Sequence, residues 1–195
     1  DSYIEKNLRI NGLSIADSLI SSRVARYVLL LTGDTYSKLI DPNDRSVATL
    51  FGDGATASLL GPDEEDSLPG VGKAYFGTDG SGGDLLHCGF GGWRKKINQN
   101  QFLKMDGAGI TAFTLSKLPK SLNNYFFKTD TKLCDYDHVI FHQANRFILE
   151  KLYKKMNIGS KGIISMEKSG NTVSSTIPIA LESFGKTLKT DLSEK

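Results

Sequence analysis

A histidine and an asparagine stand out in this sequence, because each can hydrogen-bond to an oxygen and each sits beside a predicted regular element. His142 follows the run Asp137-His138-Val139-Ile140-Phe141, whose apolar residues predict a strand. Ligands in open α/β sheets bind beyond the carboxyl ends of strands, which makes this a favourable position for a working side chain. Asn171 precedes a predicted helix, where Gly170-Asn171-Thr172 also fits plain turn and capping chemistry. A loop hydrogen bond is the corresponding plain explanation for His142, so the residues alone leave both roles open.

Other candidate sites fit structural explanations better. Cys88 and His87 are neighbours in the glycine-rich segment 78–92, and adjacent residues rarely form a nucleophile and its base. The turn Gly52-Asp53-Gly54 lacks a phosphate-loop pattern, and residues 78–84 do not match an EF-hand loop. Neither segment therefore predicts a nucleotide or calcium site.

The composition is that of an ordinary globular protein. Among 195 residues, Lys and Arg number 24 against 22 acidic residues, a net charge of +2 that argues against a dedicated nucleic-acid binder. No apolar stretch approaches the roughly 20 residues that span a bilayer, so we expect no membrane partner. Two cysteines make no disulfide framework and fit a reducing compartment, which predicts a cytoplasmic location.

Apolar spacing alternates between helical and strand periods, which predicts an α/β protein built in layers. We expect helices over residues 12–22, 107–125 and 145–156, and another that begins near Ser174 or Ser175, with Pro178 in its first turn. Expected strands are 26–32, 47–51, 55–60, 71–77 and 137–141. The polar, acidic segment 62–70 reads as a linker.

Four motifs together resemble one known family, the β-ketoacyl-acyl carrier protein synthase III branch of the thiolase-like condensing enzymes. Their order and spacing agree with the family from about Gly12 to Lys186. The motifs are Asp44-Arg45-Ser46 leading into Leu50-Phe51-Gly52-Asp53-Gly54-Ala55, then Leu103-Lys104-Met105-Asp106-Gly107, then Phe141-His142-Gln143-Ala144-Asn145, and last Gly170-Asn171-Thr172-Val173-Ser174-Ser175-Thr176-Ile177-Pro178.

The resemblance implies an α/β, thiolase-like layered αβαβα fold that is incomplete in this chain. Residues 1–61 would end the first half, 62–70 would link the halves, and 71–195 would form a second half without its last strands. It also implies a decarboxylative Claisen condensation of an acyl-CoA starter with malonyl-acyl carrier protein in fatty acid biosynthesis. The implied partners are acyl-CoA, acyl carrier protein and a second copy of the chain, with no nucleic acid, metal or other cofactor.

By resemblance, His142 and Asn171 are the histidine and asparagine of the family's Cys-His-Asn triad, and Asn145 lies near the phosphopantetheine arm. An imidazole and a carboxamide can both donate hydrogen bonds to the enolate oxygen that forms when malonyl-thioester loses carbon dioxide. The family's cysteine falls near Lys6 here, and a lysine ammonium cannot carry an acyl group as a thioester. We therefore expect an incomplete piece that is inactive alone. Phe147 stands where the family often has a basic residue facing the carrier, with Arg146 one place earlier.

Two other functions stay open at this point. A non-catalytic thiolase-fold relative would bind acyl-CoA or a protein partner without turnover, although it would have no chemical need for both His142 and Asn171. A related synthase of secondary metabolism would share both residues and differ in its pocket.

Overall fold

A computed structural model describes residues 2–62, 70–89 and 102–193 of the chain. The helices are α1 (Ser2–Ser21), α2 (Arg45–Ala48), α3 (Gly107–Thr129), α4 (Arg146–Lys155) and α5 (Thr176–Ser193). The strands are β1 (Val28–Asp34), β2 (Gly54–Leu60), β3 (Leu86–Cys88) and β4 (Leu103–Met105). Helices and strands share the chain, as an α/β protein requires. No helix among the described residues combines the length and apolar character needed to cross a membrane.

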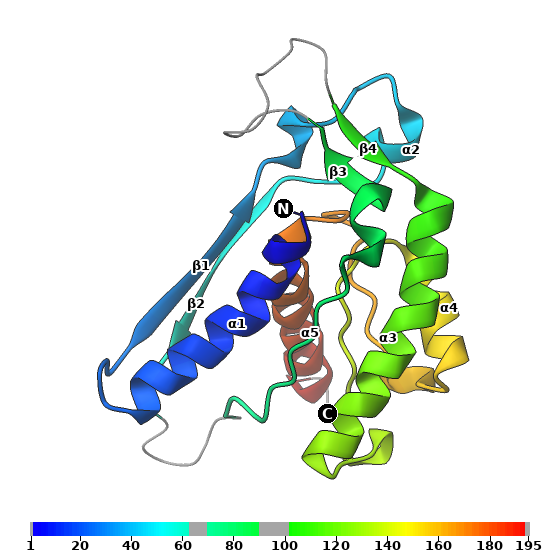
Figure 1. Ribbon diagram of the computed structural model, residues 1–195. Coiled ribbons are helices and arrows are strands. Elements are labelled where there is room, and N and C mark those ends of the chain that lie inside the picture. The colour runs from blue at the N-terminus through cyan, green and yellow to red at the C-terminus, as the bar shows by residue number, and fades with distance from the viewer. Residues whose placement is uncertain (1, 63–69, 90–101, 194–195) are drawn as a thin grey trace.

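Strands β1 and β2 pair antiparallel, with Val28 opposite Leu60 and Asp34 opposite Gly54. Helices α1 and α5 lie beside this pair, while α3 packs against α4 (Figure 1). The α1 contact is close: a Cβ at Gly12 would lie 2.8 Å from the Cδ1 atom of Leu30. One face of the strand pair is thereby covered by helices.

The opposite face of the β1–β2 pair is apolar and open to solvent. Leu29, Leu31 and Leu59 are 58%, 66% and 71% exposed, and they alternate with the partly buried residues of the covered face. Alternation of this kind normally hides the apolar side chains in a core. Exposed apolar side chains gathered on one face commonly mark a contact surface, so we expect another layer to cover this face.

Two apolar clusters support the segments that carry the candidate residues. The first joins α2, β3, β4 and the turn before α5, and its buried members are Tyr36, Ile40, Val47, Leu86, Leu103 and Val173. The second joins α4 to the segment before His142, and it contains Leu149, Tyr153 and Ile158 with Val139 and Phe141 packed against them. Each cluster thus ends next to one of the two candidate residues.

Several predicted elements are confirmed. Residues 12–22 lie within α1 except for the last, 107–125 lie within α3, and 145–156 correspond to α4 with its two caps. A 3-10 turn, Val173–Ser175, leads into α5, whose first turn contains Pro178 as expected. The strands predicted at 26–32 and 55–60 correspond to β1 and β2. Most of the predicted linker, 63–69, lies outside the described residues, so the domain boundary stays a prediction.

Three predicted strands are wrong. Residues 47–51 begin inside helix α2, because Asp44 caps that helix through Ser46 N–H at 2.9 Å and Val47 turns inward at helical spacing. Residues 71–77 form no strand and are mostly exposed. Residues 137–141 make a single parallel bridge, Val139 to Gly162, instead of a ladder. An apolar run becomes a strand only when a neighbouring strand pairs with it, which the sequence pattern does not reveal.

Candidate active site

Asn171 opens a tight, buried turn that ends where α5 begins. Its side chain is 4% exposed, and its Oδ1 accepts a hydrogen bond from the Val173 backbone N–H at 3.0 Å. Val173 has a φ of +52°, a left-handed conformation that is unusual for a β-branched residue. Such strain of about 1–3 kcal/mol persists only where surrounding contacts hold it, and it gathers at functional sites.

The backbone of Asn171 is bound to the segment between α2 and β2. Its N–H donates to the Leu50 carbonyl and its carbonyl accepts from Gly52 N–H, both at 3.0 Å. Glycine is required at position 52, since a Cβ there would lie 2.2 Å from the Ser169 carbonyl oxygen. The Gly52-Asp53-Gly54 segment, which lacks a phosphate-loop pattern, therefore holds the asparagine turn in place.

Ser174 and Ser175, the following residues of this turn, are each hydrogen-bonded to the β1–β2 strand pair. The Ser174 backbone N–H donates to Asp34 Oδ2 at 2.9 Å, and the Ser174 hydroxyl donates to the same oxygen. Ser175 is fully buried, and its hydroxyl oxygen lies 3.0 Å from that of Thr32 on β1. Its hydroxyl also lies within 3.3 Å of the Gly54 carbonyl. The turn is therefore fixed to both strands of the β1–β2 pair.

Thr176 connects this turn to the histidine. Its Oγ1 lies 2.8 Å from Nδ1 of His142 and 3.2 Å from the Val173 carbonyl oxygen. His142 thus contacts the fifth residue after Asn171, although the two lie 29 positions apart in the sequence. The structure therefore links the loop of His142 to the turn that begins at Asn171. That both side chains face one oxygen stays a prediction.

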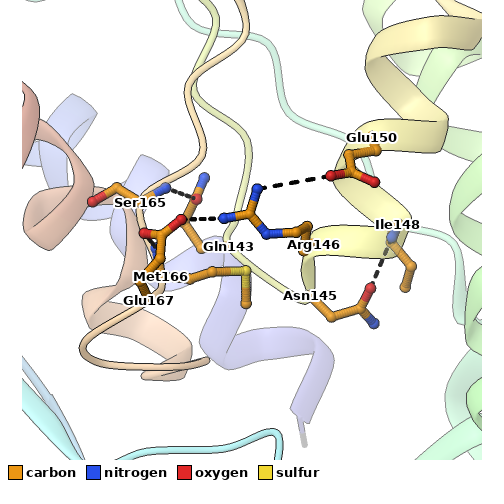
Figure 2. A network of polar contacts seen from close by, with 8 residues as sticks. All are labelled: Gln143, Asn145, Arg146, Ile148, Glu150, Ser165, Met166 and Glu167. Atoms are coloured by element: carbon orange, nitrogen blue, oxygen red, sulfur yellow. Dashed lines mark hydrogen bonds and ion pairs between the residues drawn. The ribbon is translucent and has the colours of Figure 1, made fainter.

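The loop that carries His142 is held from the other side by Gln143. This side chain is fully buried, and its Nε2 donates to the Phe141 carbonyl at 2.7 Å. Its Oε1 accepts from Ser165 N–H at 2.8 Å. Figure 2 shows Gln143 and Arg146 reaching from one segment to Ser165 and Glu167 on the other.

The same two segments are joined again beneath the loop by Tyr153 of α4. Its hydroxyl donates to the Ile163 carbonyl at 2.6 Å. Burial raises the pKa of the Tyr153 hydroxyl to about 12, because the charged phenolate loses solvation in the protein interior. The tyrosine is therefore a neutral donor at physiological pH and serves as a structural support.

Asn145 has a structural role that the sequence did not reveal. It is the N-cap of α4, and its Oδ1 accepts from Ile148 N–H at 2.7 Å (Figure 2). Capping of this kind stabilises a helix by about 1 kcal/mol. The cap uses one lone pair of the carbonyl oxygen and does not involve the NH2 group, which is the donor for a substrate contact. The predicted substrate-binding role of Asn145 stays a prediction.

The site has hydrogen-bond donors, but no thiol is built into the asparagine turn. Cys88 and Cys134 form no disulfide and are exposed, whereas the turn from Asn171 to Thr176 is largely buried. Position 6 lies in α1, and the structure does not describe its side chain. Within the described residues, no group of three His, Cys, Asp or Glu side chains could hold a metal ion. The imidazole of His142 and the carboxamide of Asn171 are hydrogen-bond donors of the kind that stabilises a negative charge developing on oxygen.

Sequence reasoning missed three supporting residues of this site, namely Asp34, Gln143 and Thr176. A polar residue at the end of an apolar strand was the one available signal for Asp34. Gln143 and Thr176 belong to the family motifs, but the partners that join them to other segments, Ser165 and His142, lie 22 and 34 positions away in sequence.

Comparison with known proteins places these features in one family. The model for 3-oxoacyl-[acyl-carrier-protein (ACP)] synthase III matches residues 9–80, and the model for its C-terminal part matches residues 127–191. A β-ketoacyl-[acyl-carrier-protein] synthase III of Clostridium tetani is 35% identical in an alignment of 184 residues that covers 87% of this chain and 54% of that protein.

Solved structures agree. A crystal structure of a 3-oxoacyl-(acyl-carrier-protein) synthase III is 38% identical with a TM-score of 0.85, over 92% of this chain and 58% of that one. The priming β-ketosynthase of the R1128 polyketide pathway is 29% identical with a TM-score of 0.76, over 90% and 53% of the two chains. These matches confirm the predicted α/β, thiolase-like fold. The chain spans just over half the length of the proteins it matches.

Proposed function

This chain belongs to the 3-oxoacyl-[acyl-carrier-protein] synthase III family, and on that premise we propose that it is part of a condensing acyltransferase. The reaction joins an acyl-CoA starter to malonyl-acyl carrier protein in fatty acid biosynthesis. The observation that carries the proposal is the turn from Asn171 to Thr176, which holds the asparagine and contacts His142 through Thr176. A protein that only binds an acyl group would not need a histidine joined through Thr176 to the strained, buried turn that carries the asparagine.

The proposed chemistry needs two donors aimed at one oxygen. Cleavage of the malonyl carbon–carbon bond releases carbon dioxide and leaves an enolate whose oxygen carries the negative charge. The enolate carbon then attacks the acyl thioester carbonyl, and the thiolate leaves. His142 and Asn171 would donate to the enolate oxygen, and such donors typically contribute factors of about 10²–10³ each. The resemblance puts the acyl-carrying cysteine near Lys6, where this chain has no thiol, so the condensation would need a cysteine that residues 1–195 do not supply there.

The proposed partners follow from the same reaction. Acyl-CoA and malonyl-acyl carrier protein are the substrates, no cofactor takes part, and the protein acts in the cytoplasm as a homodimer. Asn145 would contact the phosphopantetheine arm through its NH2 group. At the place where the family often has a basic residue, Phe147 is 58% exposed, and Lys151 Nζ lies 5.3 Å from its ring centre. Lys151 would therefore supply the positive charge that an acidic carrier needs.

One alternative is a related synthase of secondary metabolism. The likeness to the priming β-ketosynthase favours it, since that protein belongs to a polyketide biosynthetic pathway. The choice between the two depends on the starter acyl group. Assays with short straight-chain, branched and longer acyl-CoA starters would distinguish them.

A hybrid enzyme tests the proposed function. Residues 9–191 of this chain, the range spanned by the two family matches, would replace the matching segment of the Clostridium tetani synthase, so that the relative supplies the rest of the enzyme, including the segment that carries the cysteine. We expect ketoacyl product from the hybrid, and losses of about 10²–10³ in kcat for His142→Ala and for Asn171→Ala. The unmodified 195-residue chain should form none. A folded hybrid without activity, or activity that survives both substitutions, would refute the proposal.

A further inference from the structure

The Thr176 hydroxyl has a single proton and two acceptors within reach. Its oxygen lies 2.8 Å from Nδ1 of His142 and 3.2 Å from the carbonyl oxygen of Val173. If the proton goes to the carbonyl, Nδ1 of a neutral ring must carry its own proton and donate. If the proton goes to Nδ1, that nitrogen accepts, and the ring proton must sit on Nε2. The position of one hydroxyl proton therefore decides the tautomer of the histidine.

The two distances favour the histidine as acceptor. Hydrogen bonds from a hydroxyl to a carbonyl oxygen normally span about 2.5–3.0 Å, so the 3.2 Å contact with Val173 is long. The 2.8 Å contact with His142 has ordinary length. We propose that Thr176 is a positioning residue, which donates its hydroxyl proton to Nδ1 of His142 and keeps the imidazole proton on Nε2.

The surroundings of Thr176 hold its hydroxyl in this position. The side chain is 3% exposed, so water does not compete for the proton. A β-branched side chain has few χ1 rotamers, and here the preceding backbone is also fixed by the anchors of Ser174 and Ser175. The hydroxyl therefore keeps its direction while other groups at the site react.

This assignment has a consequence for the chemistry, and that consequence rests on the proposed function. A neutral imidazole can donate to an enolate oxygen only from a protonated nitrogen. Because Nδ1 faces Thr176, the donor must be Nε2. By accepting the Thr176 proton at Nδ1, the neutral imidazole of His142 would keep its own proton on Nε2, where it can be donated without formation of an imidazolium ion. The tautomer itself does not depend on whether the protein is an enzyme.

Nitrogen-15 NMR of the purified 195-residue chain measures the tautomer directly. The chain has three histidines, so His87→Gln and His138→Gln variants identify the signals of His142. With the ring neutral, we expect a protonated Nε2 and an unprotonated Nδ1. Thr176→Val keeps the shape and removes the hydroxyl, which should lower the ratio of the two tautomers about three- to tenfold. Thr176→Ser should restore it.

Thr172 provides a matched control on the same turn. It is also fully buried, and its Oγ1 has no hydrogen-bond partner within the described residues. Thr172→Val should therefore leave the His142 signals unchanged. A proton on Nδ1 in the unmodified chain would overturn the inference. An unchanged tautomer ratio in Thr176→Val would overturn it as well.

Activity of the hybrid separates this inference from the proposed function. Thr176→Val should lower kcat about tenfold with KM unchanged, and Thr176→Ser should recover most of the rate. If the folded hybrid is inactive but the NMR result holds, the proposed function fails and the tautomer assignment stands. If the hybrid is active and Thr176→Val leaves both kcat and the tautomer unaltered, the role of Thr176 is refuted.

Discussion

Replacement of Gln143 by leucine should destabilise the protein far more than replacement of nearby charged residues. The Gln143 amide joins the loop of His142 to the segment 163–165, with contacts of 2.7 Å to the Phe141 carbonyl and 2.8 Å from Ser165 N–H. The side chain is fully buried, so water cannot replace it without opening the structure. Leucine fills a similar volume but can neither donate nor accept.

The size of the effect follows from the groups left behind. Each buried backbone group without a partner costs about 1–3 kcal/mol. Two such groups give about 2–6 kcal/mol, and the contact with the Ile163 carbonyl, at 3.4 Å, adds little. Domains of this size have total stabilities of about 5–15 kcal/mol, so the loss is a large share of the total.

Urea unfolding followed by circular dichroism measures this loss as a shift in midpoint at constant slope. Arg146→Ala is the matched control, because its ion pair with Glu167 joins the same two segments at the surface (Figure 2). Both side chains of that pair are more than half exposed, and such pairs contribute about 0–1 kcal/mol. If Gln143→Leu costs no more than Arg146→Ala, the buried amide does not hold the loop, and the reasoning is wrong.

Three further outcomes are expected. Gly52→Ala should lower the free energy of unfolding by about 1–3 kcal/mol, since the new methyl would meet the Ser169 carbonyl and push the asparagine turn away; thermal unfolding measures it. The pKa of Tyr153 rises from 10.0 in the unfolded chain to about 12 in the folded chain, so the stability that its neutral hydroxyl contributes should be fully present below pH 10 and decline between pH 10 and 12. Urea unfolding measures this decline, and Tyr153→Phe should reduce it. We expect the chain to associate through the open face of the β1–β2 pair, which size exclusion with light scattering measures. The double variant Leu31→Lys, Leu59→Lys should be monomeric. A monomeric unmodified chain would exclude this face as a contact.

The helices of this fold could be predicted from the sequence because their signals are local. Apolar residues of α4 recur at helical spacing, and Pro178 fits the first turn of α5. Short apolar runs are ambiguous by comparison. Val47 and Phe51 are four residues apart, a spacing that suits one helical face as well as one strand face. Asp44 caps the helix, and an aspartate in that place is a sequence signal for a helix start.

The candidate site was predictable only in part. His142 and Asn171 were found through motifs, and the structure connects both to one turn. The supporting contacts of Gln143 with Ser165 and of Asp34 with Ser174 could not be predicted from the sequence, because the partners lie 22 and 140 positions apart in the chain. Side chains that act across such distances leave no periodic pattern, so only the fold reveals them.

A crystal structure of the hybrid with a malonyl-thioester analogue tests the central claim most directly. The measured quantities are the distances from His142 Nε2 and from Asn171 Nδ2 to the thioester oxygen of the analogue. If the two residues form one oxyanion site, both nitrogens should lie about 2.7–3.1 Å from that single atom. Side chains that open toward separate regions, with no oxygen within reach of both, would contradict the proposed chemistry.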